Sequence, residues 1–373
     1  YERVSNVTSV NEVERVCHHV SFLLMAEHCP PGQEWYNGRS TAGNLASSKA
    51  FLLQWMKETT ELGQQDFDSP TYGPLFIDAM LLVNRFSTDT NLKQRAEVMT
   101  TWLLADYLHE YFGGQLGGAH AREEMGSAMQ PVLSEFSALA WLYFGDGLQV
   151  YSREQYIAAR CAYRPPKQLV SLALDKLRPF EAWEMKRSAT RVRGDAAPTR
   201  RVQKYTYFDP LYVMGHLERG LVQPREQHTW DVTWAGEEPG TSLFTMQPYA
   251  EADGLAEFFP HQPEKVNRGI STLDPYYGTV TKTVGGSPYE DVFQYRNTTI
   301  ALYNIPDIKR FKAMIGFLPR DVASFDVDSM RTGWITINTG DVYLAYFPLR
   351  RATVRLETLG RPLYSGHGRN GAI

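Results

Sequence analysis

Cysteine is scarce in this chain. Its 373 residues include three cysteines, Cys17, Cys29 and Cys161. Three cysteines cannot build the framework of several disulfides that holds small secreted domains together. A chain of this length can instead bury one large hydrophobic core or two moderate ones.

The chain also lacks a large excess of charge of either sign. Lys and Arg together number 38 and Asp and Glu 42, so the formal net charge is −4. Nucleic-acid-binding surfaces need a basic excess, and the composition therefore argues against a nucleic-acid partner. No stretch of 18 or more uninterrupted apolar residues occurs, so the sequence predicts no membrane span.

Aromatic residues, by contrast, are abundant and make up 13% of the chain. Aromatic side chains fill the cores of β-sandwiches, and their flat rings also line clefts that bind the apolar faces of sugars. Composition alone favours the first explanation.

Residues 1–186 carry a helical pattern. Apolar residues recur every three or four positions, as in Val13, Val16, Val20 and Leu24. The segment LFIDAMLLVNRF (75–86) is apolar on nearly every side, which predicts a helix covered all round. These patterns together indicate two concentric layers of helical hairpins. Expected N-caps of the second and fourth helices are Ser40 or Thr41 and Asp89 or Thr90, and further helices are expected at 127–144, 153–161 and 166–177.

Residues 202–373 carry the pattern of short strands. Runs rich in β-branched and aromatic residues, such as KYTYFDPLYVMG and HTWDVTWAG, are separated by Gly, Pro, Asn or Asp. In GWITINTGDVYLAYF two such runs flank NTGD, a hairpin turn. We therefore predict an antiparallel β-sandwich. The arginine-rich stretch 187–201 is predicted to be a linker or a first strand, and a surface that attracts an acidic polymer is the alternative.

Several stretches carry a resemblance to a known family. They are GQQDFDSPTYGPLFIDAMLLV, WLLADYLHEYFGGQLGGAHAREE, YTYFDPLYVMG and QHTWDVTW. In their order and spacing they resemble the heparinase II/III-like and chondroitin/alginate lyase superfamily. The resemblance implies a partial (α/α) toroid followed by a β-sandwich, with sequence missing at one or both ends. It also implies cleavage of a uronate-containing polysaccharide by β-elimination in a cleft between the two parts.

Elimination from a uronate imposes requirements on the site. The C5 proton becomes acidic only when the neighbouring carboxylate is neutralised. A site therefore needs a donor for that carboxylate, a base for C5–H and an acid for the leaving oxygen. In the superfamily that this chain resembles, tyrosine serves as acid, base or both, and histidine is an alternative base. Arginine supplies a planar fork for a carboxylate.

Tyr72 is the first catalytic candidate on these grounds. It lies in DSPTYG, just before the start of the apolar helix. The alternative is that Tyr72 only caps this helix and packs its ring against it. His18 is a supporting candidate on an early helix, with His19 beside it. Many members of the superfamily carry an Asn-His pair in that helix. Here Cys17 stands before the two histidines, which would move the carboxylate-neutralising role to a histidine.

The motif GGAHAREE (117–124) supplies two further candidates. Its glycines are expected to release the chain from the preceding helix into a loop. That loop would present His120 as a base or carboxylate neutraliser and Arg122 as the carboxylate clamp. Glu123 and Glu124 are expected to begin the next helix, where they would offset its dipole.

The strand region contributes His228 as another supporting catalytic candidate. Strand alternation predicts that His228 and Trp230 share one face while Asp231 points to the opposite one. No metal site is therefore predicted and no cofactor is expected, although some members of the superfamily hold a structural divalent metal near the sandwich. The predicted substrate-binding residues are Tyr207, Trp230, His19 and Asp68.

Two other functions remain open. A glycoside hydrolase on the same scaffold would use two carboxylates, and a non-catalytic glycan-binding or structural protein would keep the fold without the site. An acidic polysaccharide partner favours a secreted, periplasmic or cell-surface location, and sequons at Asn6 and Asn297 permit glycosylation there. The chain begins at Tyr1 without a signal peptide, so its N-terminus indicates no location. Candidate carboxylates for hydrolysis are Asp66, Asp68, Glu123, Glu124 and Asp231.

Overall fold

The computed structural model describes residues 12–123, 127–128, 130–188, 200–218, 227–236, 241–247, 286–287, 289–305, 313–317, 324–328, 333–349, 353–356, 362–367 and 371–372. Helices come first along the chain and antiparallel strands follow, as the sequence predicts. None of the helices in these ranges combines the length and the apolar character that crossing a membrane requires. Asn6 and Glu124 lie outside these ranges.

The helical half packs around one central helix. The α-helices are α1 (Glu12–Ala26), α2 (Thr41–Leu62), α3 (Gly73–Phe86), α4 (Thr90–Tyr107), α6 (Glu135–Phe144), α7 (Arg153–Arg160) and α8 (Lys167–Leu174), and the 3₁₀ helix η3 spans Pro131–Leu133. Helix α3 contacts α1, α4, α6 and α7, and most of its residues are buried. This confirms the expectation of a helix covered on nearly every side.

The predicted N-caps of α2 and α4 are confirmed. The Ser40 side chain accepts a hydrogen bond from the Gly43 N–H, and the Asp89 side chain accepts one from the Leu92 N–H. Each bond satisfies a backbone donor that has no partner inside the helix, so local sequence alone sets these two starting points.

An eight-stranded antiparallel sheet follows the helices. Its spatial order is β14-β15-β10-β7-β6-β5-β4-β3. The strands are β3 (Phe180–Ser188), β4 (Arg200–Asp209), β5 (Tyr212–Glu218), β6 (Trp230–Trp234), β7 (Ser242–Met246), β10 (Ala313–Phe317), β14 (Thr353–Leu356) and β15 (Pro362–His367). Strand β3 begins at Phe180, so the sheet starts earlier than the predicted boundary at residue 187. Residues 189–199 of the arginine-rich stretch lie outside the described residues.

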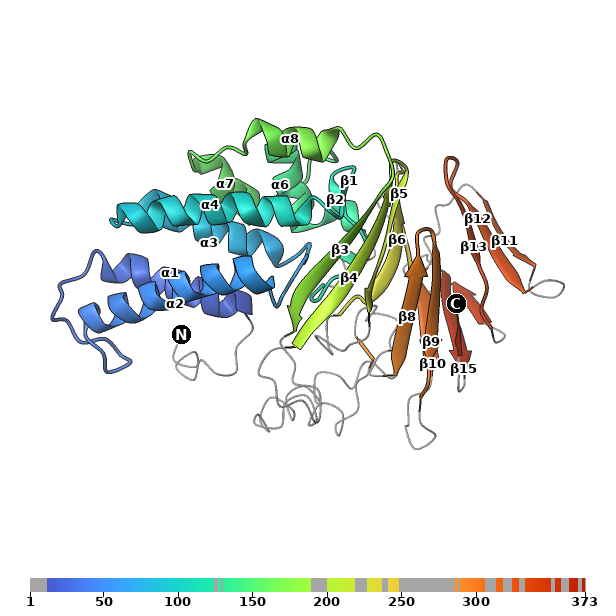
Figure 1. Ribbon diagram of the computed structural model, residues 1–373, viewed down its shortest axis with the longest axis horizontal. Coiled ribbons are helices and arrows are strands. Elements are labelled where there is room, and N and C mark those ends of the chain that lie inside the picture. Colours follow the sequence, from blue (N-terminus) through green and yellow to red (C-terminus); the bar gives the residue numbers. More distant parts are fainter. Residues whose placement is uncertain are drawn as a thin grey trace.

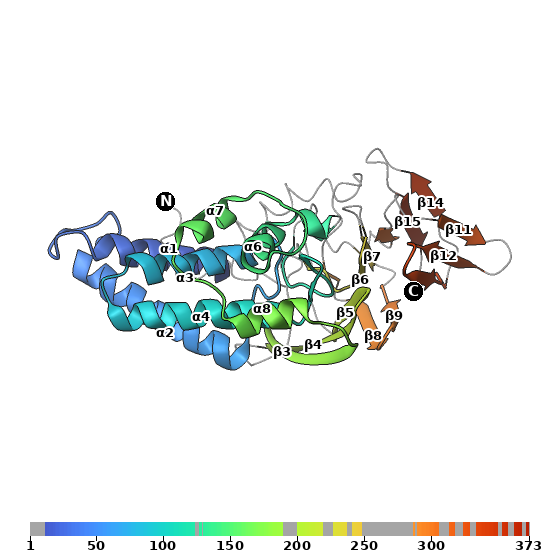
Figure 2. The ribbon, with the colours of Figure 1, turned by 90° about the horizontal axis from the view of Figure 1, so that it is seen from above.

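Two three-stranded sheets complete the strand region. One has the order β11-β12-β13 and the other β16-β9-β8. Their strands are β8 (Glu290–Tyr295), β9 (Thr298–Tyr303), β11 (Ser324–Asp328), β12 (Trp334–Asn338), β13 (Tyr343–Tyr346) and β16 (Gly371–Ala372). The NTGD turn joins β12 to β13, which confirms the predicted hairpin. Figures 1 and 2 show the helices on one side of β3–β6, with β8, β9 and β11–β13 on the other.

The glycine-rich segment after α4 differs from the prediction. Helix α4 ends at Tyr107, and a short hairpin of β1 (Tyr111–Phe112) and β2 (Gln115–Leu116) follows it. Gly117 and Gly118 come after this hairpin, so they do not cap the helix. Instead they allow a close approach to the sheet. A Cβ on Gly118 would lie 3.3 Å from the Gly215 Cα, and Gly118 has φ +84°.

Side chains alternate between the two faces of the large sheet. On β4, Lys204 contacts Asp68 and Thr206 contacts Glu110, both in the helical half. Tyr205 points the other way and packs near Trp183, with ring centroids 4.2 Å apart. The face that carries Lys204 and Thr206 therefore meets the helical half, and we call this contact between residues 64–72, 106–123 and strands β3–β6 the seam.

Candidate active site at the seam

Tyr72 and Arg122 meet at the seam although fifty residues separate them in sequence. The Arg122 Cζ lies 3.7 Å from the centroid of the Tyr72 ring, and its Nη1 lies 3.6 Å from Asp66 Oδ2. The Tyr72 N–H donates to Ser69 Oγ at 2.9 Å, which fixes the turn before α3. Arg122 and Asp66 are buried, whereas Tyr72 is half-buried. Two of the predicted catalytic residues thus form one contact.

His120 and His228 form a second pair. Their backbones exchange two hydrogen bonds, of 2.8 and 2.9 Å, in an isolated antiparallel bridge. Their rings stack with centroids 5.8 Å apart, and both side chains are buried. The Ala121 N–H donates to the Phe67 carbonyl at 3.2 Å, so the segment 118–122 lies between the Tyr72 turn and the sheet. This position explains why residues from three distant parts of the chain converge.

The environment of His228 differs from the prediction. Its Nε2 lies 3.2 Å from Asp231 Oδ2 and its Nδ1 lies 3.5 Å from Glu123 Oε2. Strand β6 begins at Trp230, so strand alternation does not extend back to His228 and the predicted opposite faces are wrong. Glu123 is non-helical and 2% exposed, so it faces His228 instead of lying on an exposed first turn. The Asp231 carboxylate also accepts from the Gly118 N–H.

Burial and neighbouring charges give these groups different protonation states. Burial, together with Lys204 and His228, holds the pKa of His120 well below its usual value, so His120 is neutral. Burial also lowers the pKa of His228, but Glu123 and Asp231 outweigh it and the net shift is upward. Burial raises the pKa of Glu123 to about 8. The site therefore holds one neutral imidazole, His120, and a coupled pair, Glu123 and His228, in which a charge on either group stabilises a charge on the other.

Asp68 is held by two lysines of the sheet. Its Oδ2 lies 2.6 Å from Lys204 Nζ and 3.2 Å from Lys186 Nζ. Asp68 has φ +50°, a conformation that non-glycine residues seldom adopt. Its side chain is fully buried, so the predicted role in substrate binding is not supported by its contacts. Asp68 instead ties the turn that carries Tyr72 to β3 and β4.

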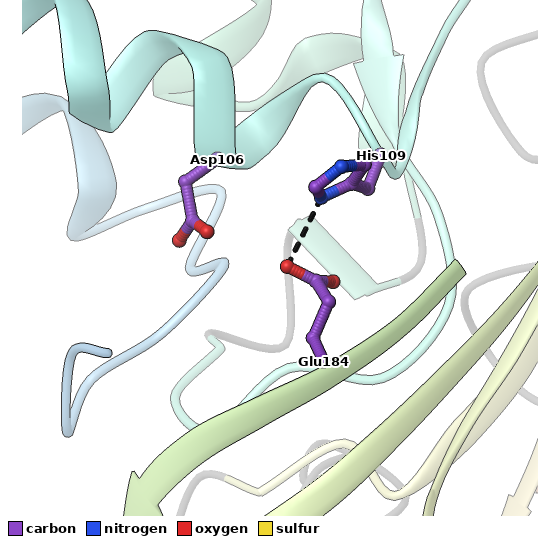
Figure 3. A group of neighbouring side chains, drawn as sticks. All are labelled: Asp106, His109 and Glu184. Carbon is purple, nitrogen blue, oxygen red and sulfur yellow. Dashed lines mark hydrogen bonds and ion pairs between the residues drawn. The ribbon is translucent and has the colours of Figure 1, made fainter. Parts of the chain in front are cut away.

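A group of three metal-ligating side chains lies at the edge of the seam. Asp106, His109 and Glu184 place their ligand atoms within 4.8 Å of one another. Figure 3 shows His109, just after α4, pointing toward Glu184 of β3, and their Nδ1–Oε1 distance is 3.0 Å. The Lys186 ammonium lies 2.9 Å from Asp106 and 3.0 Å from Glu184, so it already supplies a cation there. We therefore assign no metal ligands to this group.

His18 and His19 lie elsewhere on α1. The His18 ring packs against Phe22 at 4.2 Å between centroids, and the His19 ring stacks on Phe51 of α2 at 4.0 Å. His19 Nδ1 also lies 3.2 Å from Ser48 Oγ. The His19 contacts join α1 to α2, whereas the His18–Phe22 contact lies within α1. None of these contacts joins the two histidines to Tyr72 and Arg122.

Tyr207 and Trp230 belong to the other face of the sheet. Tyr207 lies near Tyr212, with ring centroids 6.1 Å apart. Trp230 packs in a hydrophobic cluster with Val292 and Ile335 of the two smaller sheets. It also lines a cavity of about 720 Å³ between these sheets and β5–β7. Both aromatic residues are thus separated from Tyr72 by the sheet itself.

Sequence reasoning did not find the two buried lysines. Lys186 and Lys204 are both shielded from solvent, although lysine is seldom buried unless it is paired. One signal was available for Lys204. It occupies an alternating position of an aromatic strand, KYTYF, where an inward-facing residue is expected. No comparable signal marks their partners, because these come from distant segments.

Comparison with known proteins gives no relative for this chain. No family model, no curated protein and no solved structure matches it.

Proposed function

We propose that this protein is a polysaccharide lyase that cleaves a uronate-containing glycan by β-elimination. In this proposal the helical hairpins are part of an (α/α) toroid, the sheets form a β-sandwich, and the substrate binds at the seam. The observation that carries the proposal is the stack of the Arg122 guanidinium on the Tyr72 ring at 3.7 Å. A secreted, periplasmic or cell-surface location would suit such a polymeric partner.

Tyr72 is the residue that meets the substrate in this proposal. It is half-buried, whereas Arg122, His120 and His228 are each 5% exposed or less. A cation over an aromatic ring favours negative charge on the phenol oxygen. Tyr72 can therefore act as the base for C5–H, as the acid for the leaving glycosidic oxygen, or as both in turn.

The buried groups behind Tyr72 supply charge and position. Arg122 is the candidate clamp for the uronate carboxylate, since its planar fork matches that group. His228 favours its charged form and adds a second positive charge behind the clamp. The neutral state of His120 suits a base better than a cationic neutraliser. His18 has no role in this proposal because it packs on Phe22 instead.

The direct test is incubation with a panel of uronate polymers, including alginate, hyaluronan, chondroitin and heparin. A lyase leaves unsaturated ends, which absorb ultraviolet light. Tyr72→Phe keeps the ring under Arg122 but removes the hydroxyl, and it should lower kcat by at least about 100-fold. Tyr36→Phe is the matched control, because Tyr36 is 56% exposed and should leave the rate unchanged.

Other outcomes would point to the alternative functions. New reducing ends without ultraviolet absorbance would indicate a hydrolase, for which Glu123 and Asp231, on either side of His228, are the carboxyl pair to test. Binding of the polymers without any cleavage, unaffected by Tyr72→Phe, would indicate a glycan-binding protein. Either result would overturn the lyase proposal.

A further inference from the structure

The seam contains a buried group of charges that the proposed function does not use. Four carboxyl groups surround two ammonium groups, with oxygen–nitrogen distances of 2.6 to 3.2 Å. If every group were ionised, the formal charge would be −2, and an unbalanced charge is costly to bury. We call this group the carboxylate–lysine cage, and its members are Asp68, Asp106, Glu110, Glu184, Lys186 and Lys204.

Two carboxylate oxygens of the cage have no hydrogen-bond partner among the residues that the structure describes. They are Oε2 of Glu110 and Oε2 of Glu184, and both atoms are shielded from solvent. Carboxyl oxygens of these two residues and of Asp68 lie within 4.8 Å of one another. Buried oxygens without a donor are rare in folded proteins because they lose their hydrogen bonds to water. The cage therefore lacks one donor and holds too little positive charge.

The other carboxyl oxygens of Glu110 and Glu184 already have partners. Glu110 Oε1 lies 2.9 Å from Lys204 Nζ and accepts from Thr206 Oγ1 at 3.2 Å. Glu184 Oε1 lies 3.0 Å from both Lys186 Nζ and His109 Nδ1. A divalent metal ion on the two free oxygens would lie close to both ammonium groups, and like charges repel strongly in a buried site. A proton is the cation that fits.

We propose that Glu110 and Glu184 share one buried proton, with Glu110 as the acid and Glu184 as the acceptor, and that this proton makes the seam sensitive to pH. Glu110 follows α4 and Glu184 lies on β3, so the shared proton joins the helical half to the sheet. The inference does not depend on the proposed lyase activity, because it concerns only the contact between the two halves.

The directions of the pKa shifts agree with this assignment. Burial and the neighbouring Asp68 raise the pKa of Glu110 well above its usual value. Burial would also raise the pKa of Glu184, but Lys186 and His109 outweigh it and the net shift is downward. The proton therefore stays on Glu110 while Glu184 remains a carboxylate.

Several cationic groups surround the pair. The hydrogen bond with Glu184 raises the pKa of His109 and so favours its charged form. With Glu110 neutral, the three other carboxyl groups of the cage face Lys186, Lys204 and His109, and Lys176, whose pKa burial lowers to about 8, lies near Glu110. The titratable groups that face the pair are Asp68 from the turn before α3, Asp106 and His109 from α4 and its end, Lys186 from β3, Lys204 from β4, and Lys176 after α8.

The sign of the pH effect follows from Glu110. Its pKa in the folded protein is above the ordinary value of 4.5, so the folded state binds the proton more tightly than the unfolded state. Stability from this pair is therefore present at low pH and is lost as the pH rises through the folded pKa. Above that pH, two ionised carboxylates face each other across the seam.

The experiment compares Glu110→Gln with the wild-type protein. The glutamine amide donates permanently to Glu184 and has no proton to lose. Thermal unfolding midpoints are measured from pH 6 to pH 9. The fall in Tm over this range should be smaller in Glu110→Gln by about 3 °C or more. Glu58→Gln is the control, since Glu58 pairs with Arg187 outside the cage, and it should follow the wild-type curve.

Infrared spectroscopy observes the proton itself. At pH 7 the carboxylic acid band of the wild-type protein should exceed that of Glu110→Gln by the contribution of one group, since Asp78 and Glu123, whose pKa values are raised to about 8, absorb equally in both. Glu184→Gln should lose the same absorbance, because a glutamine amide at 184 would let Glu110 ionise. This second variant replaces Glu110→Gln if that variant does not fold. Parallel Tm curves, or a band unchanged in both variants, would overturn the proposal. So would an increase in wild-type Tm on adding Mg²⁺, Ca²⁺ or Mn²⁺ that Glu110→Gln abolishes, since a metal ion would then occupy the place of the proton.

Discussion

Lys204 Nζ lies 2.6 Å from Asp68 Oδ2, and both side chains are fully shielded from solvent. The two residues are 136 positions apart, on β4 and in the turn that leads to Tyr72. This ion pair attaches that turn to the sheet. The position of the proposed catalytic tyrosine therefore depends on a contact that lies beneath it.

Lys204→Met should destabilise the protein strongly. The substitution leaves the Asp68 and Glu110 carboxyl groups buried with one cation fewer, and breaking a buried ion pair costs about 3–5 kcal/mol. Urea denaturation measures the loss. Lys49→Met removes a partly exposed pair with Asp89 and should change stability by less than about 1 kcal/mol. Equal losses in the two variants would show that the buried pair adds nothing beyond an exposed one.

Gly118→Ala should destabilise more than Gly113→Ala. Both glycines have positive φ, so both substitutions strain the backbone by about 1–2 kcal/mol. A Cβ at 118 would also lie 3.3 Å from the Gly215 Cα, whereas no atom of the described residues lies within 4 Å of a Cβ at 113. The difference in unfolding free energy between the two variants isolates the close approach of the 117–123 segment to β5. Indistinguishable variants would mean that the segment can move away without cost.

Asp78→Asn should reduce the loss of stability at alkaline pH. Both carboxylate oxygens of Asp78 are buried and have no hydrogen-bond partner in the described part of the chain, and burial, with Glu154, raises the pKa of Asp78 to about 8. The folded state therefore holds this proton more tightly than the unfolded state, and stability falls as the pH rises from about 4 to about 8. Chemical denaturation at pH 5 and pH 8 should show a smaller difference for Asp78→Asn than for the wild type.

Asp89 provides the control of opposite sign. Its hydrogen bond with Lys49 lowers the pKa of Asp89, so its contribution is present above the unfolded pKa and is lost as the pH falls through the folded one. Asp89→Asn should therefore leave the difference between pH 5 and pH 8 unchanged. A reduced difference in this variant too would attribute the effect to overall charge and not to burial.

Arg122→Lys should impair the proposed lyase activity although it keeps the positive charge. Lysine has no planar fork to stack on Tyr72 or to bind a carboxylate, so kcat/KM should fall about 10- to 100-fold. Arg15→Lys is the matched control, because Arg15 also lies over an aromatic ring. The Cζ atom of Arg15, on α1, lies 5.0 Å from the ring centroid of Phe51, on α2. Activity unchanged in Arg122→Lys would remove Arg122 from the site.

Part of the fold was predictable because its causes are local. The N-caps at Ser40 and Asp89 depend on side chains three residues from the donors that they satisfy, and the NTGD hairpin depends on its own turn. The helical period and the strand period each arise within one element. The helix-then-strand order could therefore be predicted, as could the nearly complete burial of α3.

The sequence predicted which residues belong to the candidate site, but it did not predict which of them contact one another. Tyr72, His120, Arg122 and His228 were candidates by residue type and motif, but their pairing required the fold. The error at His228 shows why. Its face was predicted by strand alternation, yet β6 begins two residues later at Trp230, and a shift in where a strand begins changes which side chains share a face.

The sequence by itself determined where α2 and α4 begin and that helices precede strands, because hydrogen bonds between near neighbours and the period of apolar residues decide this. Only the tertiary structure decided which charges meet. Asp68 could bind water, substrate or a cation, and it is the packing of β3 and β4 against the turn at 66–72 that places Lys186 and Lys204 beside it. Burial then makes each of these charges depend on the others, since no water remains to stabilise them singly.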